Sequence, residues 1–201
     1  GFIDFVDIPF TKGWVQIKGE LAYGKFMDND FLRDHYNYYN QYITTDALYH
    51  HKSISFRSNP DKPFVVTIGA ELAAQFGGTK RYYEKGILID SLTMKSPTRL
   101  KDFFKILFPS SGQTNEGDQA YYYGNHVGQW NLSAEYRFKD NSSVRGYFEW
   151  YYDDASGMGK FNGWDGLWGL EYKSGKKNWL SNVVLEYLDM TNQSGPLNWC
   201  P

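Results

Sequence analysis

Aromatic, acidic and amide side chains gather in the connections between the extended segments of this chain, and this combination is suited to binding sugars. Residues 25–47 hold a run of tyrosines among Asp and Asn, residues 80–83 read Lys-Arg-Tyr-Tyr, and 154–165 add further acids and a tryptophan. A flat ring can stack on the apolar face of a pyranose, carboxylates and amides can bond to its hydroxyls, and Lys80 and Arg81 could attract acidic sugars. The candidate contact residues are Asp34, Tyr36, Tyr38, Tyr39, Arg81, Asp154, Trp164 and Asp165. The alternative is that these rings only pack the connections together.

Catalytic and metal-binding patterns are weak by comparison. His50 and His51 are adjacent, so on a strand they would point to opposite faces and could not hold one metal together. Asp28-Asn29-Asp30 begins like a calcium loop but lacks the glycine and the glutamate that such a loop requires. The one cysteine, Cys200, excludes an intrachain disulfide and a cysteine-based zinc site. We therefore predict no catalytic residue, no metal and no cofactor, and a protein that is not an enzyme.

A second set of polar residues alternates with apolar ones, and this period of two predicts β-strands with one apolar face. Residues 130–139 show the pattern most clearly. The polar members would share one face, as a ladder of Gln16, Lys18, Glu20, Glu71, Gln75, Glu135, Arg137, Arg145, Glu149 and Glu171. Such a ladder would either fill the interior of a barrel with salt bridges or form a charged track that guides an acidic polymer.

The connections between strands differ systematically in length. We expect extended segments at about 2–9, 14–24, 48–57, 64–76, 120–139, 144–153, 166–173 and 179–188. Short polar turns alternate with long connections at about 25–47, 77–119 and 154–165, so an antiparallel up-and-down meander would carry every long connection at one end. One short helix is expected in the longest loop, because Leu100, Phe103, Phe104 and Leu107 recur at helical spacing.

Composition limits the class of protein. A net charge of −2 gives no argument for nucleic-acid binding. No apolar run is long enough for a transmembrane helix, but the strands of a membrane barrel need only about 9–11 alternating residues. Aromatic residues make up 19% of the chain, and several lie near strand ends, where the girdles of a barrel would be. We predict an all-β domain over 1–201 that belongs to an outer-membrane β-barrel with extracellular long loops; the family resemblance described next implies that the barrel is larger than this chain.

An ordered set of short motifs resembles a known family. The motifs are GWVQIKG at 13–19, YHHKS at 49–53, AAQFGG at 73–78, YGNH at 123–126, SGM at 156–158, GWDGL at 163–167 and QSGP at 193–196. Together they resemble the capsule-assembly Wzi family in the form common in Bacteroides-type bacteria. The resemblance implies a Gram-negative outer-membrane barrel, lectin-like and not enzymatic, that helps attach capsular polysaccharide to the cell surface. Its partners would be that polysaccharide and outer-membrane lipid. The alternatives are a passive outer-membrane channel and a soluble carbohydrate-binding β-sandwich.

Overall fold

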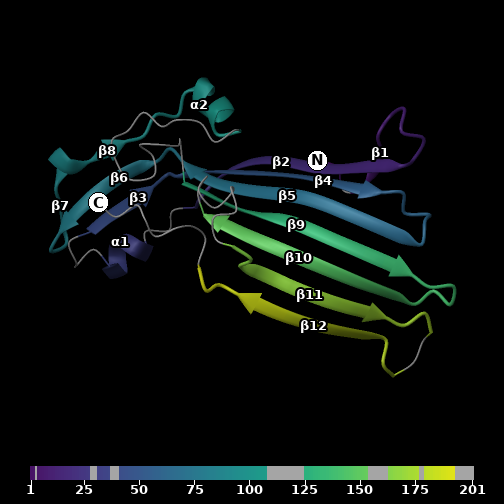
Figure 1. Cartoon of the computed structure of the whole chain (residues 1–201). Helices are drawn as coiled ribbons and strands as arrows, with labels where there is room; N and C mark the ends of the chain where they lie inside the picture. The colour runs from purple at the N-terminus through teal and green to yellow at the C-terminus, as the bar shows by residue number, and fades with distance from the viewer. Residues whose placement is uncertain are drawn as a thin grey trace. The chain divides into compact units, whose positions relative to one another are not determined.

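The computed structural model describes residues 1–2, 4–27, 31–36, 41–107, 125–153, 163–176 and 179–192. About half of them belong to one large sheet, whose strands follow each other in chain order from β1 to β12 (Figure 1). Its strands are β1 (Val6–Asp7), β2 (Val15–Lys25), β4 (Leu48–Ser58), β5 (Phe64–Phe76), β9 (Asn125–Arg137), β10 (Ser143–Asp153), β11 (Gly166–Lys173) and β12 (Asn182–Asp189). This arrangement confirms the predicted all-β antiparallel meander. Within the described residues β1 and β12 do not pair with each other, so the sheet is open there.

The predicted strand limits agree with the structure where turn residues bound a long alternating run. β2, β4, β5, β10 and β11 each lie within one residue of the prediction. Two outer segments are shorter than predicted. The chain turns after Ile8, whose carbonyl accepts a hydrogen bond from the Thr11 hydroxyl at 2.8 Å, and this turn ends β1 early. β12 begins late because the turn before it closes between the Ser174 amide and the Ser181 carbonyl at 2.9 Å.

A small second sheet forms within two of the connections that we predicted to be loops. It contains β3 (Gln41–Thr45), β6 (Thr79–Glu84), β7 (Ile87–Leu88) and β8 (Met94–Lys95), with β6 paired to each of the others. A short 3₁₀ helix, Asp90–Leu92, lies between β7 and β8. These strands are too short, and too mixed in side-chain type, for a period of two to stand out in the sequence.

Two short helices are present in the described residues. α2 (Leu100–Lys105) is the predicted helix, and α1 (Phe31–Tyr36) was not expected. Phe103 of α2 packs against a small core of Ala74, Phe76 and Ile106, whereas Leu100 and Phe104 of the predicted apolar stripe are exposed. Neither helix is long and apolar enough to span a membrane.

Packing divides the chain into two compact units. The first consists of Gly1–Leu21, Lys52–Leu72 and Val127–Pro201, and the second of Ala22–His51 and Ala73–His126. The boundaries pass through β2, β4, β5 and β9. The prediction of a single domain over 1–201 stays a prediction.

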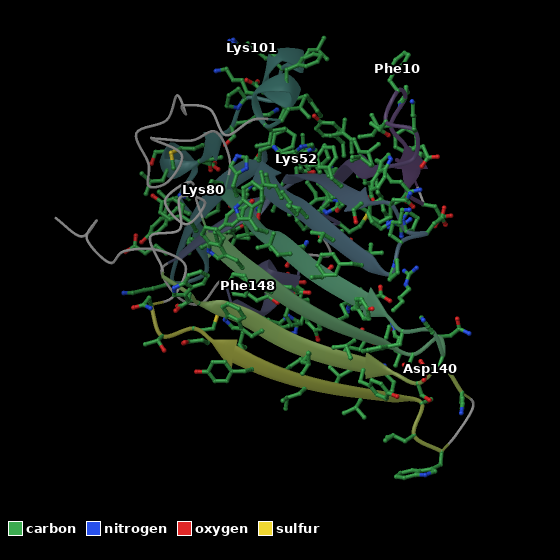
Figure 2. The ribbon with its side chains drawn as sticks, turned by 45° about the vertical axis from the view of Figure 1, so that its right-hand side comes forward. Phe10, Lys52, Lys80, Lys101, Asp140 and Phe148 are labelled. Atoms are coloured by element: carbon green, nitrogen blue, oxygen red, sulfur yellow. The ribbon has the colours of Figure 1, made fainter. Side chains whose placement is uncertain are left out.

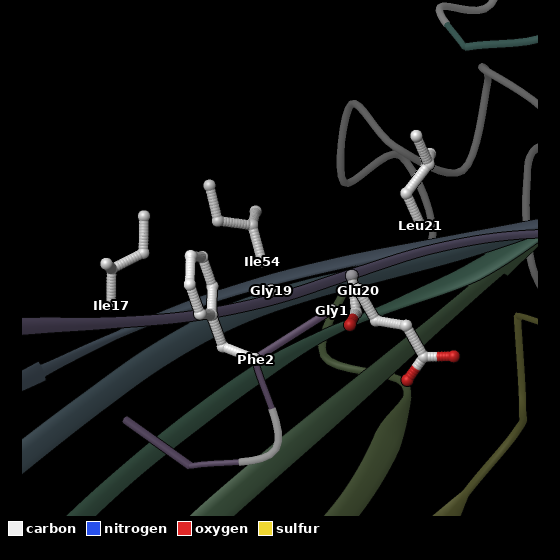
Figure 3. A pocket seen from close by; sticks show the side chains of 8 residues that line it. Gly1, Phe2, Ile17, Gly19, Glu20, Leu21 and Ile54 are labelled. Carbon is white, nitrogen blue, oxygen red and sulfur yellow. The ribbon is translucent and has the colours of Figure 1, made fainter. Parts of the chain in front are cut away.

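The two faces of the large sheet in the first unit differ in chemistry, as the alternation predicts. Figure 3 shows Ile17, Leu21 and Ile54 on one side of the strands and the Glu20 carboxylate on the other. In β9, β10 and β11 the register places Val144 opposite Tyr136 and Tyr172, and on the other face Arg145 opposite Glu135 and Glu171. We call these the apolar face and the polar face.

Side-chain hydrogen bonds close the tight turns at one end of the strands. Asp140, labelled in Figure 2 at the β9–β10 turn, accepts hydrogen bonds from the Ser142 hydroxyl at 2.6 Å and from the Ser142 amide at 3.1 Å. Asn141 between them has φ of 64°, a left-handed conformation that asparagine tolerates well. These local contacts fix a tight turn, and with it the pairing of β9 and β10.

The Asp140 turn makes a pH-dependent contribution to folding. Hydrogen bonds from the Ser142 hydroxyl and amide lower the pKa of the Asp140 carboxyl. Because the folded-state pKa is the lower one, this stabilisation is present above the unfolded-state pKa and is lost as the pH falls through the folded-state pKa. We expect Ser142→Ala to raise the pKa of Asp140 toward its ordinary value in a carboxyl NMR titration. Thr191→Ala, which removes the equivalent hydroxyl from the Asp189 turn, should leave it unchanged, and an unchanged pKa in Ser142→Ala would refute this account.

Candidate functional site

Two tyrosines and a lysine form a partly exposed platform on one face of the small sheet. Tyr42 of β3 lies opposite Tyr82 of β6, and Thr44 lies opposite Lys80. The two tyrosine rings are 4.8 Å apart at 53° to each other, and the Lys80 ammonium is 4.6 Å from the centre of the Tyr42 ring. Tyr42 is 44% exposed. We call Tyr42, Tyr82 and Lys80 the tyrosine platform.

The chemistry of this platform suits a sugar ring. Tyrosine offers a flat apolar surface together with a hydroxyl that can donate or accept a hydrogen bond. A lysine ammonium beside the rings adds a positive charge that can attract a carboxylate on a sugar. The sequence predicted sugar-contact residues in 25–47 and in 80–83 separately. Only the pairing of β3 with β6 in the structure shows that Tyr42 and Tyr82 lie together.

Arg81 lies on the opposite face of the same strand from Lys80. Its register partner is Ile43, and its guanidinium donates a hydrogen bond to the Thr45 hydroxyl. Ile43 and Tyr83, on the same face as Arg81, are buried. Arg81, a candidate contact residue in the sequence, therefore lies away from the platform and against the covered side of the small sheet.

Backbone geometry at the start of β6 determines how the platform strands pair. Gly78 has φ of 86°, and a side chain there would meet the Thr45 carbonyl at 2.8 Å and the Ala47 backbone at 3.1 Å. Asp46, between β3 and β4, also has a left-handed conformation, and its carboxylate contacts the Lys25 ammonium at 2.5 Å. The hydrogen bond from Lys25 lowers the pKa of the Asp46 carboxyl. The small sheet thus begins where the two segments, one at Asp46 and one at Gly78, leave regular extended geometry.

The other candidate residues of the first long connection are only partly described. Asp34 is exposed on α1, beside a stacked pair of Phe31 and His35 rings 4.2 Å apart. Tyr36 ends α1, and its side chain is outside the described part of the structure. Tyr38, Tyr39 and Asp154 also lie outside the described residues.

Trp164 and Asp165 have different surroundings although they are adjacent. Asp165 is 2% exposed, and both of its carboxylate oxygens accept hydrogen bonds from Asn192, from the amide at 2.7 Å and from the side chain at 3.0 Å. Trp164 is exposed, and its carbonyl accepts a hydrogen bond from the Trp168 indole at 3.2 Å. Its ring lies 5.9 Å from the Trp168 ring and 6.4 Å from the Phe148 ring, both on the apolar face. Asp165 therefore ties two chain segments together, and Trp164 joins the apolar-face aromatic cluster.

The turn-end half of the polar face is an ion-pair ladder. Glu171 contacts Arg145 at 3.0 Å and Lys173 at 3.2 Å, and Glu135 contacts Arg137 at 3.1 Å. These contacts connect neighbouring strands as well as alternate residues of one strand. The ladder stabilises register, because each charge has an opposite charge within reach.

The remaining residues of the predicted ladder make looser contacts. Gln129 donates to Glu71 at 3.4 Å, and Gln16 accepts from Arg57 at 2.6 Å. Glu149 accepts from the Tyr151 hydroxyl at 2.7 Å. Lys18, Glu20 and Gln75 are exposed on their strands.

Among the described residues, no group of three or more His, Cys, Asp or Glu side chains could hold a metal ion. A shallow open hollow involves Phe2, Ile17, Leu21 and Ile54, and its lining is mainly apolar (Figure 3).

Comparison with known proteins gave no match to a family model, a curated protein or a solved structure. The resemblance to the Wzi family therefore remains a hypothesis.

The platform should depend on Gly78 more than on most glycines of the chain. We expect Gly78→Val to disrupt the pairing of β3 with β6, because the new side chain meets backbone atoms and the left-handed conformation costs about 1–2 kcal/mol for such a residue. Hydrogen exchange should then accelerate at residues 41–45 and 79–84 but not in β10 and β11. Gly146→Ala is the matched control, since nothing lies within 4 Å of a Cβ there. Unchanged protection of β6 in Gly78→Val would refute this role of Gly78.

Proposed function

We propose that this protein forms part of an outer-membrane β-barrel and binds capsular polysaccharide, helping to anchor it at the surface of a Gram-negative cell. In this proposal the large sheet is the membrane wall, and the tyrosine platform contacts the polymer. The activity is lectin-like and requires no catalysis. The resemblance to the Wzi family implies only the class of polymer, a capsular polysaccharide, and the surfaces described above support the proposal.

The main evidence for the proposed membrane location is the exposed apolar face of β9 to β12. Register aligns its side chains in rows, so that Leu170 and Leu185 lie side by side, as do Trp168 and Tyr187. Leu170 is 51% exposed and Leu185 is 70% exposed. Further exposed apolar-face residues of these strands are Leu132, Tyr136, Trp168, Tyr172, Val183 and Tyr187. A continuous exposed apolar surface marks a contact with lipid or with another protein.

The distribution of aromatic rings along this face favours lipid. Tyr136 and Tyr172 lie near the tight turns, while Phe148 and Trp168, with Trp164, lie toward the other end of the strands. Figure 2 shows Asp140 at the turn and Phe148 farther along β10. Aliphatic residues such as Leu170 lie between the two groups. Membrane barrels have this order, an apolar band between two aromatic girdles.

The lengths of the connections support an extracellular position for the platform. The short turns at 59–63, 138–142 and 174–181 alternate with the long connections at 26–47, 77–124 and 154–165. In an antiparallel meander the long ones all leave from one end, as the extracellular loops of outer-membrane barrels do. β3 and β6 belong to two of these long connections. A soluble sandwich would instead bury its apolar faces against each other, and the exposure of Leu170 and Leu185 argues against that alternative.

A charged residue on the apolar face should interfere with membrane insertion, whereas one on the polar face should not. Leu132 and Ser133 are adjacent in β9 and point to opposite faces. We expect Leu132→Arg to lower the free energy of unfolding in lipid vesicles by about 1–2 kcal/mol, between the costs of arginine at the interface and at the middle of a bilayer, because Leu132 lies level with Phe148. Ser133→Arg is the matched control and should have a much smaller effect. Equal effects of the two substitutions would contradict the assignment of the lipid face.

Removing a ring of the platform should weaken polysaccharide binding. We expect Tyr82→Ala and Tyr42→Ala each to weaken binding by roughly two- to tenfold, the range for loss of one aromatic contact. Retention of capsular polysaccharide on cells with equal surface amounts of protein would measure the effect, together with binding of the purified polymer. Tyr136→Ala, which removes an exposed ring from the apolar face, is the control. Wild-type retention in both platform variants would exclude the platform as the contact.

A further inference from the structure

We infer that the polar face of the large sheet carries a second saccharide site, centred on the Tyr147 ring, that binds a neutral pyranose. The inference rests on the proposed function, because a polysaccharide must reach this face. It concerns residues of β10, β11 and β12 in the first unit, separate from the tyrosine platform.

The polar face changes in chemistry along β10. At the turn end Arg145 lies between Glu135 and Glu171 and pairs with the latter. Beyond Arg145, the next three polar-face residues of β10 are Tyr147, Glu149 and Tyr151. Their register partners in β9 are Ser133, Asn131 and Gln129, all of them neutral and able to form hydrogen bonds. The ion-pair ladder thus gives way to hydroxyl, amide and carboxylate groups, which are suited to contacting sugar hydroxyls.

The Tyr147 ring lies across its neighbouring strand. Gly169 of β11 is its register partner, and a Cβ on this glycine would overlap the far end of the ring. The Tyr147 hydroxyl reaches over β11 and donates a hydrogen bond to Glu186 of β12, the register partner of Gly169 on the other side. The ring therefore covers the backbone at Gly169 with one side, and its other side, over which the Arg145 guanidinium lies 4.8 Å from the ring centre, is directed away from the sheet. A pyranose can stack on such a surface.

The charges around this ring favour a neutral sugar. Glu186 and Glu149 accept hydrogen bonds from the hydroxyls of Tyr147 and Tyr151, which carry no positive charge. An ionised carboxylate has about four lone-pair positions, so each retains capacity for a sugar hydroxyl. The nearest cation is the Arg145 guanidinium, 4.8 Å from the Tyr147 ring centre, and Glu171 pairs with it at 3.0 Å. Two carboxylates facing the ligand would repel an acidic sugar, in contrast to the platform with its Lys80.

The test uses the full chain reconstituted in lipid vesicles, with calorimetric titration of defined probes. The probes are neutral hexasaccharides of glucose, mannose and galactose, and a hexamer of galacturonic acid as the acidic one. Titrations in a background with alanine at Tyr42, Lys80 and Tyr82 remove all three side chains of the platform. We expect at least one neutral hexasaccharide to bind there and the acidic hexamer not to bind. If no neutral hexasaccharide binds, or if the acidic hexamer binds as well as a neutral one, the inference is wrong.

Two substitutions remove the stacking surface in different ways. Tyr147→Ala deletes the ring, whereas Gly169→Val keeps the ring but displaces it from the backbone. Each substitution should weaken the binding of neutral hexasaccharides by roughly two- to tenfold. Tyr147→Phe keeps the ring without its hydroxyl and should bind neutral hexasaccharides within about twofold of the platform-deficient background. Binding by this variant would also show that the large sheet still folds when Tyr147 is changed. Tyr136→Ala on the apolar face is the matched control.

The outcomes separate this inference from the proposed function. If Tyr147→Ala and Gly169→Val bind neutral probes as the parent does while Tyr82→Ala still loses capsule, the second site is wrong and the proposed function stands. If the platform variants retain capsule but Tyr147→Ala loses neutral binding, the platform is wrong and the second site stands. Absence of all saccharide binding by the wild-type protein would overturn both.

Discussion

The register of the large sheet is the constraint on which the rest of the structure depends. Arg145 lies between two glutamates only because β9, β10 and β11 pair in one alignment, and the same alignment places Val144 between two tyrosines. Since successive residues face opposite sides, a slip of one residue would move Arg145 to the apolar face and leave carboxylates without their cation. The ion pairs at Glu171 and Glu135 and the Asp140 turn all lie near the tight turns, where they fix this alignment.

The register also gives the two faces of the large sheet different side-chain chemistry. The apolar face needs no chemistry beyond being apolar, so leucine and valine suffice between the rings. The polar face must satisfy its charges within the protein, and it does so through Arg145 and Glu171 near the turns. Farther along β10 the acids meet tyrosine hydroxyls instead, as Glu149 meets Tyr151. A surface that has satisfied its own charges with neutral donors is free to exchange hydrogen bonds with a neutral ligand.

The long strands were predictable from sequence because alternation over 8–13 residues leaves few other interpretations, as in β5 and β11. The small sheet was not, since β7 and β8 have two residues each and β6 mixes basic and aromatic residues on both faces. Its formation depends on contacts between distant segments, with Tyr42 paired to Tyr82. The candidate site was predicted only as a composition. Lys80 and Arg81 are neighbours in sequence, and only the pairing with β3 shows that they serve opposite faces.

Aromatic residues serve two purposes in this chain, and their immediate partners distinguish them. Trp164 lies near Trp168 and Phe148, rings that line the apolar face, and its carbonyl accepts the Trp168 indole hydrogen bond. Such contacts suit a girdle at a membrane surface, where one end of the ring is apolar and the other is hydrated. Tyr42 and Tyr147 instead lie beside Lys80 and Arg145. A ring with charged neighbours can hold a polar ligand in one orientation, so composition alone could not have separated the sugar-contact candidates from the proposed membrane-facing rings.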